Sequence, residues 1–179
     1  MSKTGKKHPH KSRGQAAVEF ALVLPLLVFV VVGLIEAGRA MFIYTSVTNA
    51  SRESSRYGSA FGLLPDETTA KYQDCAGIRN AARQAGFYTP FLDDDIVIEY
   101  DEGPDPDTGV IPAPFDTCDG DADLGVTLEC GDRIVVTINY TYSPMLNLIP
   151  LQPQTIVSSS ARTFLGVITL EEDFTCGGG

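Results

Sequence analysis

The chain has 179 residues, 44% of them hydrophobic, and a formal net charge of −10 at pH 7. This charge argues against a nucleic-acid-binding protein, because phosphates need a basic surface. About 60 residues at the amino end are predicted to form a leader and a long helix. Roughly 120 residues remain, enough for one domain with a modest core.

Residues 1–14 form a basic, polar leader for which no packed structure is predicted. They hold five of the 13 basic residues, and no acidic residue precedes Glu19, so residues 14–179 carry eight basic and 23 acidic residues, a net charge of −15. Positive charge beside the amino end of an apolar helix stays cytoplasmic. We therefore expect residues 58–176 to form an extracytoplasmic domain, whose acidic charge keeps it soluble or attracts cations.

A helix is predicted over residues 15–57. Its apolar run reaches Ile35 and is about as long as the ~20 residues that span a bilayer. Pro25 is tolerable in a membrane helix and predicts a kink. Glu19 is the only charge of the run, and a carboxylate at bilayer depth costs roughly 2.5–3.5 kcal/mol. A cut after Gly14 would give Gln15 a free α-amine four residues from Glu19, on the same face of the helix.

The stretch Gly14-Gln15-Ala16-Ala17-Val18-Glu19-Phe20 resembles the processing site of type IV pilin-like proteins. The longer stretch through Gly38-Arg39 and Asn49-Ala50-Ser51-Arg52-Glu53-Ser54-Ser55-Arg56-Tyr57 resembles the TadE-like pseudopilins of the tight-adherence (Flp) pilus machinery. Ala50-Ser51 departs from the alanine pair that this family favours. The resemblance implies a membrane-inserted, non-enzymatic pseudopilin that a prepilin peptidase cuts after Gly14. Its partners would be other pilins or pseudopilins and the assembly platform, and Glu19 would neutralise a terminal amine during assembly.

Other interpretations of this end of the chain stay open. Residues 1–35 also fit a secretory signal peptide, although such peptides have a shorter apolar core and no buried acid. An unprocessed signal anchor is a third interpretation, and it would make the chain a membrane-anchored binding module or adhesin.

Small side chains recur along the predicted helix. Gly33 and Ala37 have the small-x-x-x-small spacing that allows close helix packing, and residues 44–51 are small and polar. We expect this surface to pack against other subunits, unless the small residues occur there by chance.

A second helix is predicted over residues 66–85, with Asp66 as its cap and Gly86 after its end. Its apolar face is expected to join the core; it comprises Ile78, Ala81, Ala82 and Ala85.

Alternating apolar residues then predict strands over residues 96–100 and 133–142, with a long loop over residues 101–125 between them. Residues 155–170 are predicted to form a final strand or a bent pair, a prediction that the serines at 158–160 weaken. The apolar, proline-rich loop 143–153 is expected to cover the sheet as a lid or to bind a partner. Residues 177–179 are expected to be disordered. The fold class is α+β, with a small antiparallel sheet.

Four cysteines lie on the expected outer side, where disulfides persist. Of the three pairings, the short intervening loop favours Cys118–Cys130, which leaves Cys75–Cys176. Free buried thiols are the alternative.

The chain offers little chemistry for catalysis. The only histidines, His8 and His10, precede Gln15, so a form that begins at Gln15 lacks histidine and histidine-based catalysis. No cofactor is expected, with calcium at Asp119, Asp121 and Asp123 as the one candidate. A solvated acidic turn is the alternative there, because the complete calcium-loop pattern is missing. Asp101, Asp105 and Asp107 form a second, looser acidic cluster.

Overall fold

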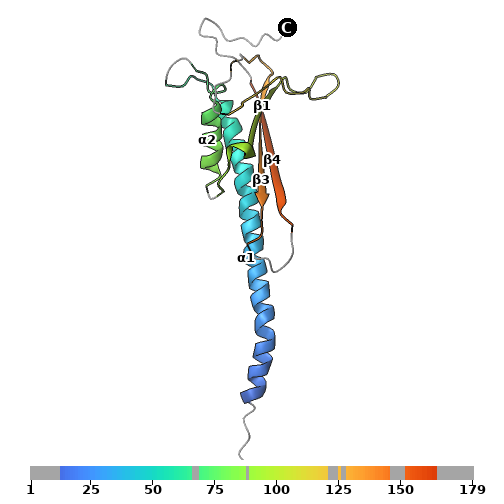
Figure 1. Cartoon of the computed structure of the whole chain (residues 1–179). Coiled ribbons are helices and arrows are strands. Elements are labelled where there is room, and N and C mark those ends of the chain that lie inside the picture. Colours follow the sequence, from blue (N-terminus) through green and yellow to red (C-terminus); the bar gives the residue numbers. More distant parts are fainter. Residues whose placement is uncertain are drawn as a thin grey trace, which may run out of the picture. The chain divides into compact units, whose positions relative to one another are not determined.

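The computed structural model describes residues 13–65, 69–87, 89–120, 125, 128–145 and 152–164. The chain divides into two compact units, Met1–Arg39 and Ala40–Gly179, which are described separately. The elements, in chain order, are α1 (Arg13–Gly58), α2 (Cys75–Ala85), the 3-10 turn η1 (Asp93–Asp95), β1 (Ile96–Asp101), β2 (Asp116–Thr117), β3 (Arg133–Tyr142) and β4 (Gln154–Thr163) (Figure 1). The predicted α+β class, with a long amino-terminal helix and an antiparallel sheet, is confirmed.

The described strands form one antiparallel sheet in the order β2-β1-β3-β4. Asp101, Arg133 and Thr163 lie in one row across β1, β3 and β4. The strand predicted over residues 133–142 has the same bounds as β3, and that over 96–100 is one residue shorter than β1. β2 was missed, because a two-residue strand is too short to show a period in the sequence.

One face of the sheet carries the core of the Ala40–Gly179 unit. Alternate residues of β1 and β3 are buried there together with apolar residues of α1 and α2; they include Ile96, Ile98, Tyr100, Ile134, Val136, Ile138, Val47, Ala50, Ile78 and Ala82. A period of two is what a strand needs to bury one face. The predicted apolar face of β3 is therefore confirmed, with Tyr140 only partly buried.

The part of α1 beyond Arg39 packs closely on β4 through serines. Ser51 and Ser55 have no exposed surface. Their hydroxyls lie 2.9 Å from those of Ser158 and Ser160, respectively. A hydroxyl buried against a matching hydroxyl keeps its hydrogen bond, and both side chains are small enough for helix and strand to approach.

The small polar surface predicted for contacts between subunits is thus partly used inside the chain. Ser46 is also buried, and its hydroxyl donates to the carbonyl of Gly86 over 2.7 Å. The serines at 158–160, which weakened the strand prediction, face either α1 or the open side of a regular strand.

Helix α2 begins at Cys75, nine residues after the predicted start, so that boundary was wrong. Asp74 is the cap: its carboxylate accepts the backbone N–H of Gly77 at 2.7 Å and the Tyr57 hydroxyl at 2.7 Å. Burial and this carboxylate raise the pKa of Tyr57 to about 12. Asp66 lies outside the described residues. The sequence-based prediction missed Asp74, which also accepts a hydrogen bond from Tyr57, 17 residues away.

Two further predictions fall largely outside the described residues. In the loop 143–153, Met145 is exposed, whereas residues 146–151 are not described. The final strand is confirmed as β4 up to Thr163, and residues 165–179 lie outside the described part.

Candidate functional site

The predicted processing site lies at the start of α1. A Cβ atom added at Gly14 would meet no atom of the described residues within 4 Å, so the described part of the fold does not require glycine there. Gln15 and Glu19 lie one helical turn apart, and the Gln15 side-chain amide donates to the Glu19 carboxylate at 3.2 Å. Residue 15 and the lone carboxylate therefore share a face, as their spacing predicted.

The apolar stretch after Glu19 is exposed. Among the described residues, α1 is the one helix that is long and apolar enough to span a membrane. The mean hydropathy of its most apolar 18-residue stretch is 2.8. None of that stretch is buried, which separates it from the core helix of a globular protein. A signal sequence would share these properties, and the helix is consistent with a membrane anchor.

Three other predicted residues lie along this stretch. Pro25 is inside α1, which continues through it. Gly33 and Ala37 are exposed, and a Cβ atom at Gly33 would meet no atom within 4 Å. Within the described residues, no contact inside this chain explains the small size of Gly33 or Ala37. Both remain available for contacts with other helices.

The predicted disulfide pairing was wrong. Cys118 is bonded to Cys75, at a Cα–Cα distance of 5.7 Å, and not to Cys130. The N–H of Cys118 donates to the carbonyl of Ile98, and Tyr100 lies beside the Cys118 sulfur at 3.7 Å. The disulfide therefore joins the first residue of α2, Cys75, to a residue that is hydrogen-bonded to β1. Cys130 is disulfide-bonded as well, and Cys176 lies outside the described residues.

The structure gives the backbone on either side of Asp119 a cationic partner that the sequence did not reveal. Arg79 is buried, and its guanidinium donates to the carbonyls of Cys118, at 2.7 Å, and of Gly120. Backbone oxygens that a calcium ion could use are thus bound to a positive charge. Asp121 and Asp123 lie outside the described residues, and no cluster of three metal-binding side chains occurs within the described part of the chain. Calcium binding here stays a prediction.

The second acidic cluster is not a single site. Asp101 is buried and makes a two-pronged ion pair with Arg133, at 2.7 and 2.8 Å. Hydrogen bonding to Arg133 is the main reason that the pKa of Asp101 is lowered. Asp105 instead accepts the backbone N–H and the hydroxyl of Thr108 and the backbone N–H of Asp107, and these bonds lower its pKa. The carboxylates of Asp101 and Asp105 are therefore engaged in separate local structures.

The comparisons with known proteins concern the amino-terminal part. Residues 14–56 match the family described as TadE-like protein, and this stretch covers nearly all of α1 and none of α2 or the sheet. No curated protein and no solved structure matches the chain. The TadE-like family is a family of non-enzymatic pilus components, which suggests a protein related to the Tad pilus. Residues 14–56 therefore form a TadE-like protein family domain.

Proposed function

We propose that this chain is a TadE-like pseudopilin, a minor pilin that helps to assemble a tight-adherence (Flp)-type pilus. In this proposal it is inserted in the cytoplasmic membrane, a prepilin peptidase cuts it after Gly14, and it then joins other pilins or the assembly platform. The observation that carries the proposal is the lone carboxylate of Glu19, one helical turn from residue 15 on an exposed apolar helix.

Glycine at position 14 supports the cleavage step. Since no described residue would clash with a side chain there, the need for glycine is expected to come from outside the chain. A peptidase must bring its catalytic groups close to the backbone, and glycine presents no side chain to obstruct them. Cleavage would turn the N–H of Gln15 into a charged amine, for which Glu19 is the nearest carboxylate.

Charge and cysteine chemistry support the orientation. The basic leader favours a cytoplasmic amino terminus, which places the Ala40–Gly179 unit outside the cytoplasm. The Cys75–Cys118 bond suits that side, because disulfides persist in oxidising compartments. Gly33 and Ala37 would pack against neighbouring helices in the membrane.

Mass spectrometry of the native amino terminus tests the proposal directly. We expect the protein to begin at Gln15. Gly14→Val should leave the precursor uncut, because a β-branched side chain blocks the approach of the peptidase. Gly33→Val is the matched control: it changes another open glycine of α1 and should be cut normally. Equal processing of the wild type and Gly14→Val would contradict the assignment. A retained leader would favour an unprocessed, membrane-anchored binding module or adhesin.

A further inference from the structure

Two arginines of the Ala40–Gly179 unit stand apart from its other basic residues. Arg52 on α1 and Arg162 on β4 are exposed and have no ion-pair or hydrogen-bond partner among the described residues. The other five basic side chains of this unit each bind a carboxylate, a carbonyl or a ring; they are Arg56, Lys71, Arg79, Arg83 and Arg133. Two unpaired guanidinium groups are unexpected in a unit with 21 acidic residues.

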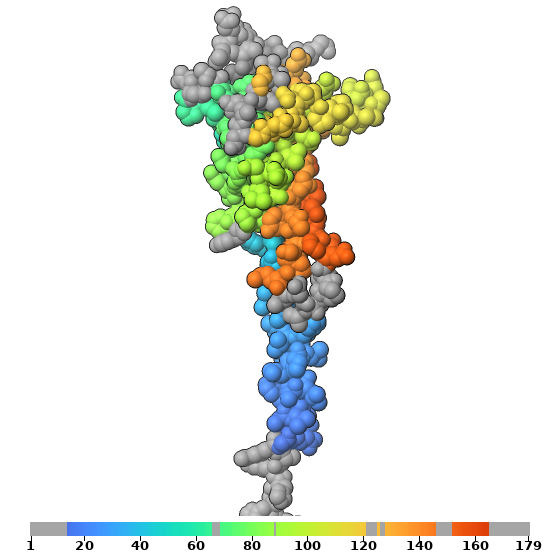
Figure 2. Space-filling view, viewed as in Figure 1, coloured from blue at the N-terminus to red at the C-terminus, as the bar shows by residue number. Residues whose placement is uncertain are grey.

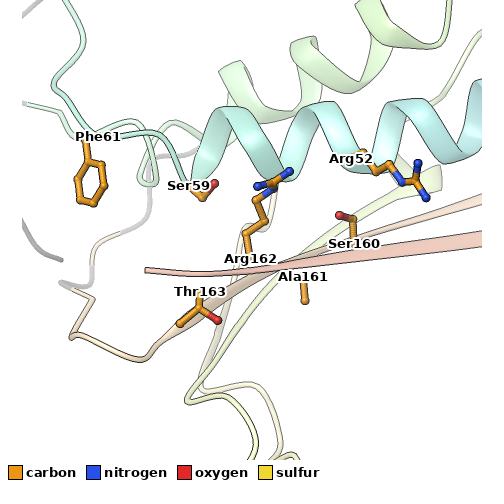
Figure 3. Close-up of a pocket in the computed structure, with 7 residues that line it drawn as sticks. All are labelled: Arg52, Ser59, Phe61, Ser160, Ala161, Arg162 and Thr163. Carbon is orange, nitrogen blue, oxygen red and sulfur yellow. The ribbon is translucent and has the colours of Figure 1, made fainter. Parts of the chain in front are cut away.

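Both arginines line one groove of about 560 Å³, formed by the end of α1 and by residues 160–163 of β4. Figure 3 shows Ser160 and Arg162 pointing from β4 toward α1, and Phe61 at one end of the groove. Phe61 is 56% exposed, and none of the seven lining residues is acidic. We call this surface the arginine groove. It combines positive charge with an aromatic ring, which suits an acidic segment that also carries apolar side chains.

The chain itself contains a segment of that kind. Residues 102–115 connect β1 to β2 and project from the unit, and we call them the acidic arm (Figure 2). The arm has three acidic residues and no basic one. Its apolar side chains Val110 and Ile111 are 64% and 57% exposed.

The arm is also held in a defined shape. One carboxylate oxygen of Asp105 accepts the backbone N–H groups of Asp107 and Thr108 and the hydroxyl of Thr108, at 2.7 to 3.0 Å. The N–H of Asp105 donates to the carbonyl of Val110 at 2.9 Å, which closes the loop. A preorganised loop loses less conformational entropy on binding than a disordered one.

Arm and groove lie at the same end of the sheet, on opposite sides. Asp101, from which the arm starts, and Thr163, at the groove, share one row through Arg133. The arm leaves on the β1–β2 side, whereas β4 is the strand at the other edge of the described sheet. Copies anchored in one membrane share one direction, and because arm and groove lie at the same end of the strands, the arm of one copy can meet the groove of a parallel neighbour. A contact of this type joins different surfaces of the two partners and can repeat along a row.

We propose that the acidic arm of one copy binds the arginine groove of a second copy. Glu102 and Asp107 face Arg52 and Arg162, and Val110 and Ile111 pack near Phe61. This inference rests on the proposed function, since it supplies a contact for a subunit that assembles. The surface is small and would bind weakly in solution, but confinement in a membrane raises the effective concentration of the partner.

The full-length chain in its own membrane is the sample for the test. A photo-crosslinking benzoylphenylalanine at position 110 is expected to form a bond with a peptide of a second copy that contains Arg52 or residues 160–163. Isotope labelling of one copy shows that the bond joins two chains.

Charge reversal makes the test specific. Arg52→Glu with Arg162→Glu, or Glu102→Arg with Asp107→Arg, should each lower the crosslink yield by about tenfold or more, because like charges then face each other. Co-expression of the two double variants should restore the crosslink, since the reversed arm meets a reversed groove. Arg56→Glu is the matched control: it lies on α1 outside the groove and should leave the yield unchanged.

Several results would overturn the inference: crosslinks only to other proteins, a groove reversal without effect, or no rescue on co-expression. The amino terminus is determined in the same sample. A terminus at Gln15 without the crosslink would reject the arm contact and leave the proposed function standing. A retained leader with an intact crosslink would reject the proposed function alone.

Discussion

At the scale of single residues, Glu19 is costly to place in the membrane, and in the proposed function its charge pairs with a terminal amine. It is the one carboxylate of an apolar stretch, and its described partner is the Gln15 side chain. A neutral amide donates a hydrogen bond to the carboxylate but leaves its charge uncompensated, whereas a terminal amine in a low-dielectric setting can stabilise it by more than the ~1 kcal/mol of a surface pair.

We predict that Glu19→Gln is inserted and cut normally but fails to assemble. Removing the charge lowers the cost of insertion, and the scissile bond lies four residues away. The loss is the attraction between residue 19 and an α-amine, in the same chain or in a neighbour. Co-purification with pilus components measures the effect, and normal co-purification of the variant would leave Glu19 as a tolerated charge at the edge of the membrane.

The buried pair of Asp101 and Arg133 is a second residue-scale feature, because it sits at the base of the acidic arm. We predict that Arg133→Met lowers the free energy of unfolding by about 3 kcal/mol, since it leaves a buried carboxylate without its partner. All seven tyrosines belong to the Ala40–Gly179 unit, so the tyrosine band of near-ultraviolet circular dichroism reports on this unit during urea unfolding.

The difference in unfolding free energy between the wild type and Arg133→Met should depend on pH. The folded-state pKa of Asp101 is lowered, so its contribution is complete above the unfolded value of about 3.9 and is lost as the pH falls through the lower folded value. The stability gap between wild type and Arg133→Met should therefore close in acid. A gap that stays constant down to pH 2 would mean that the pair acts through packing alone.

At the scale of elements, α1 changes its role along its length. Before Arg39 its apolar side chains are exposed, and beyond Arg39 it packs on β4 through serine pairs. Close packing of this kind tolerates little added volume.

We predict that Ser55→Leu lowers the free energy of unfolding by about 2 kcal/mol, because it overpacks the contact and leaves the Ser160 hydroxyl without its partner. Asn49→Leu, at an exposed position of the same helix, is the control and should change stability by no more than about 0.5 kcal/mol. Urea unfolding followed by circular dichroism measures the unfolding free energy of both variants. Equal losses in Ser55→Leu and Asn49→Leu would show that the serine contact is loosely packed.

At the scale of the whole molecule, the Cys75–Cys118 bond ties α2 to the β1–β2 side of the sheet across 43 residues. By the loop-entropy relation, a loop of 43 residues gives about 4 kcal/mol of stabilisation. We predict that a non-reducing peptide map links Cys75 to Cys118, and that the double variant Cys75→Ser, Cys118→Ser loses about that amount.

The same map should link Cys130 to Cys176, since the chain has four cysteines and Cys130 is bonded but not to Cys118. A peptide that joins Cys118 to Cys130 would contradict this connectivity. Alkylation of all four cysteines under denaturing conditions would contradict both bonds and would weaken the proposed location outside the cytoplasm.

The sequence by itself determined the features that depend on local order. These features are the apolar run with its single carboxylate, the glycine before that run, and the alternation in β3. All of them are local sequence patterns, because helices and strands repeat with fixed periods. The family match at residues 14–56 agrees with what those residues indicated.

Tertiary structure alone decided the features that join distant residues. These features are the Cys75–Cys118 bond, the hydrogen bond of Tyr57 to Asp74, the serine pairs of α1 and β4, and the hydrogen bond of Arg79 to Cys118. Each joins positions 17 to 107 residues apart. Loop length favoured Cys118–Cys130, since a short loop closes at a lower entropic cost. The packing of α2 over β1 placed Cys75 beside Cys118 instead, because once the core has formed, distance in space and not distance along the chain decides which sulfur atoms meet.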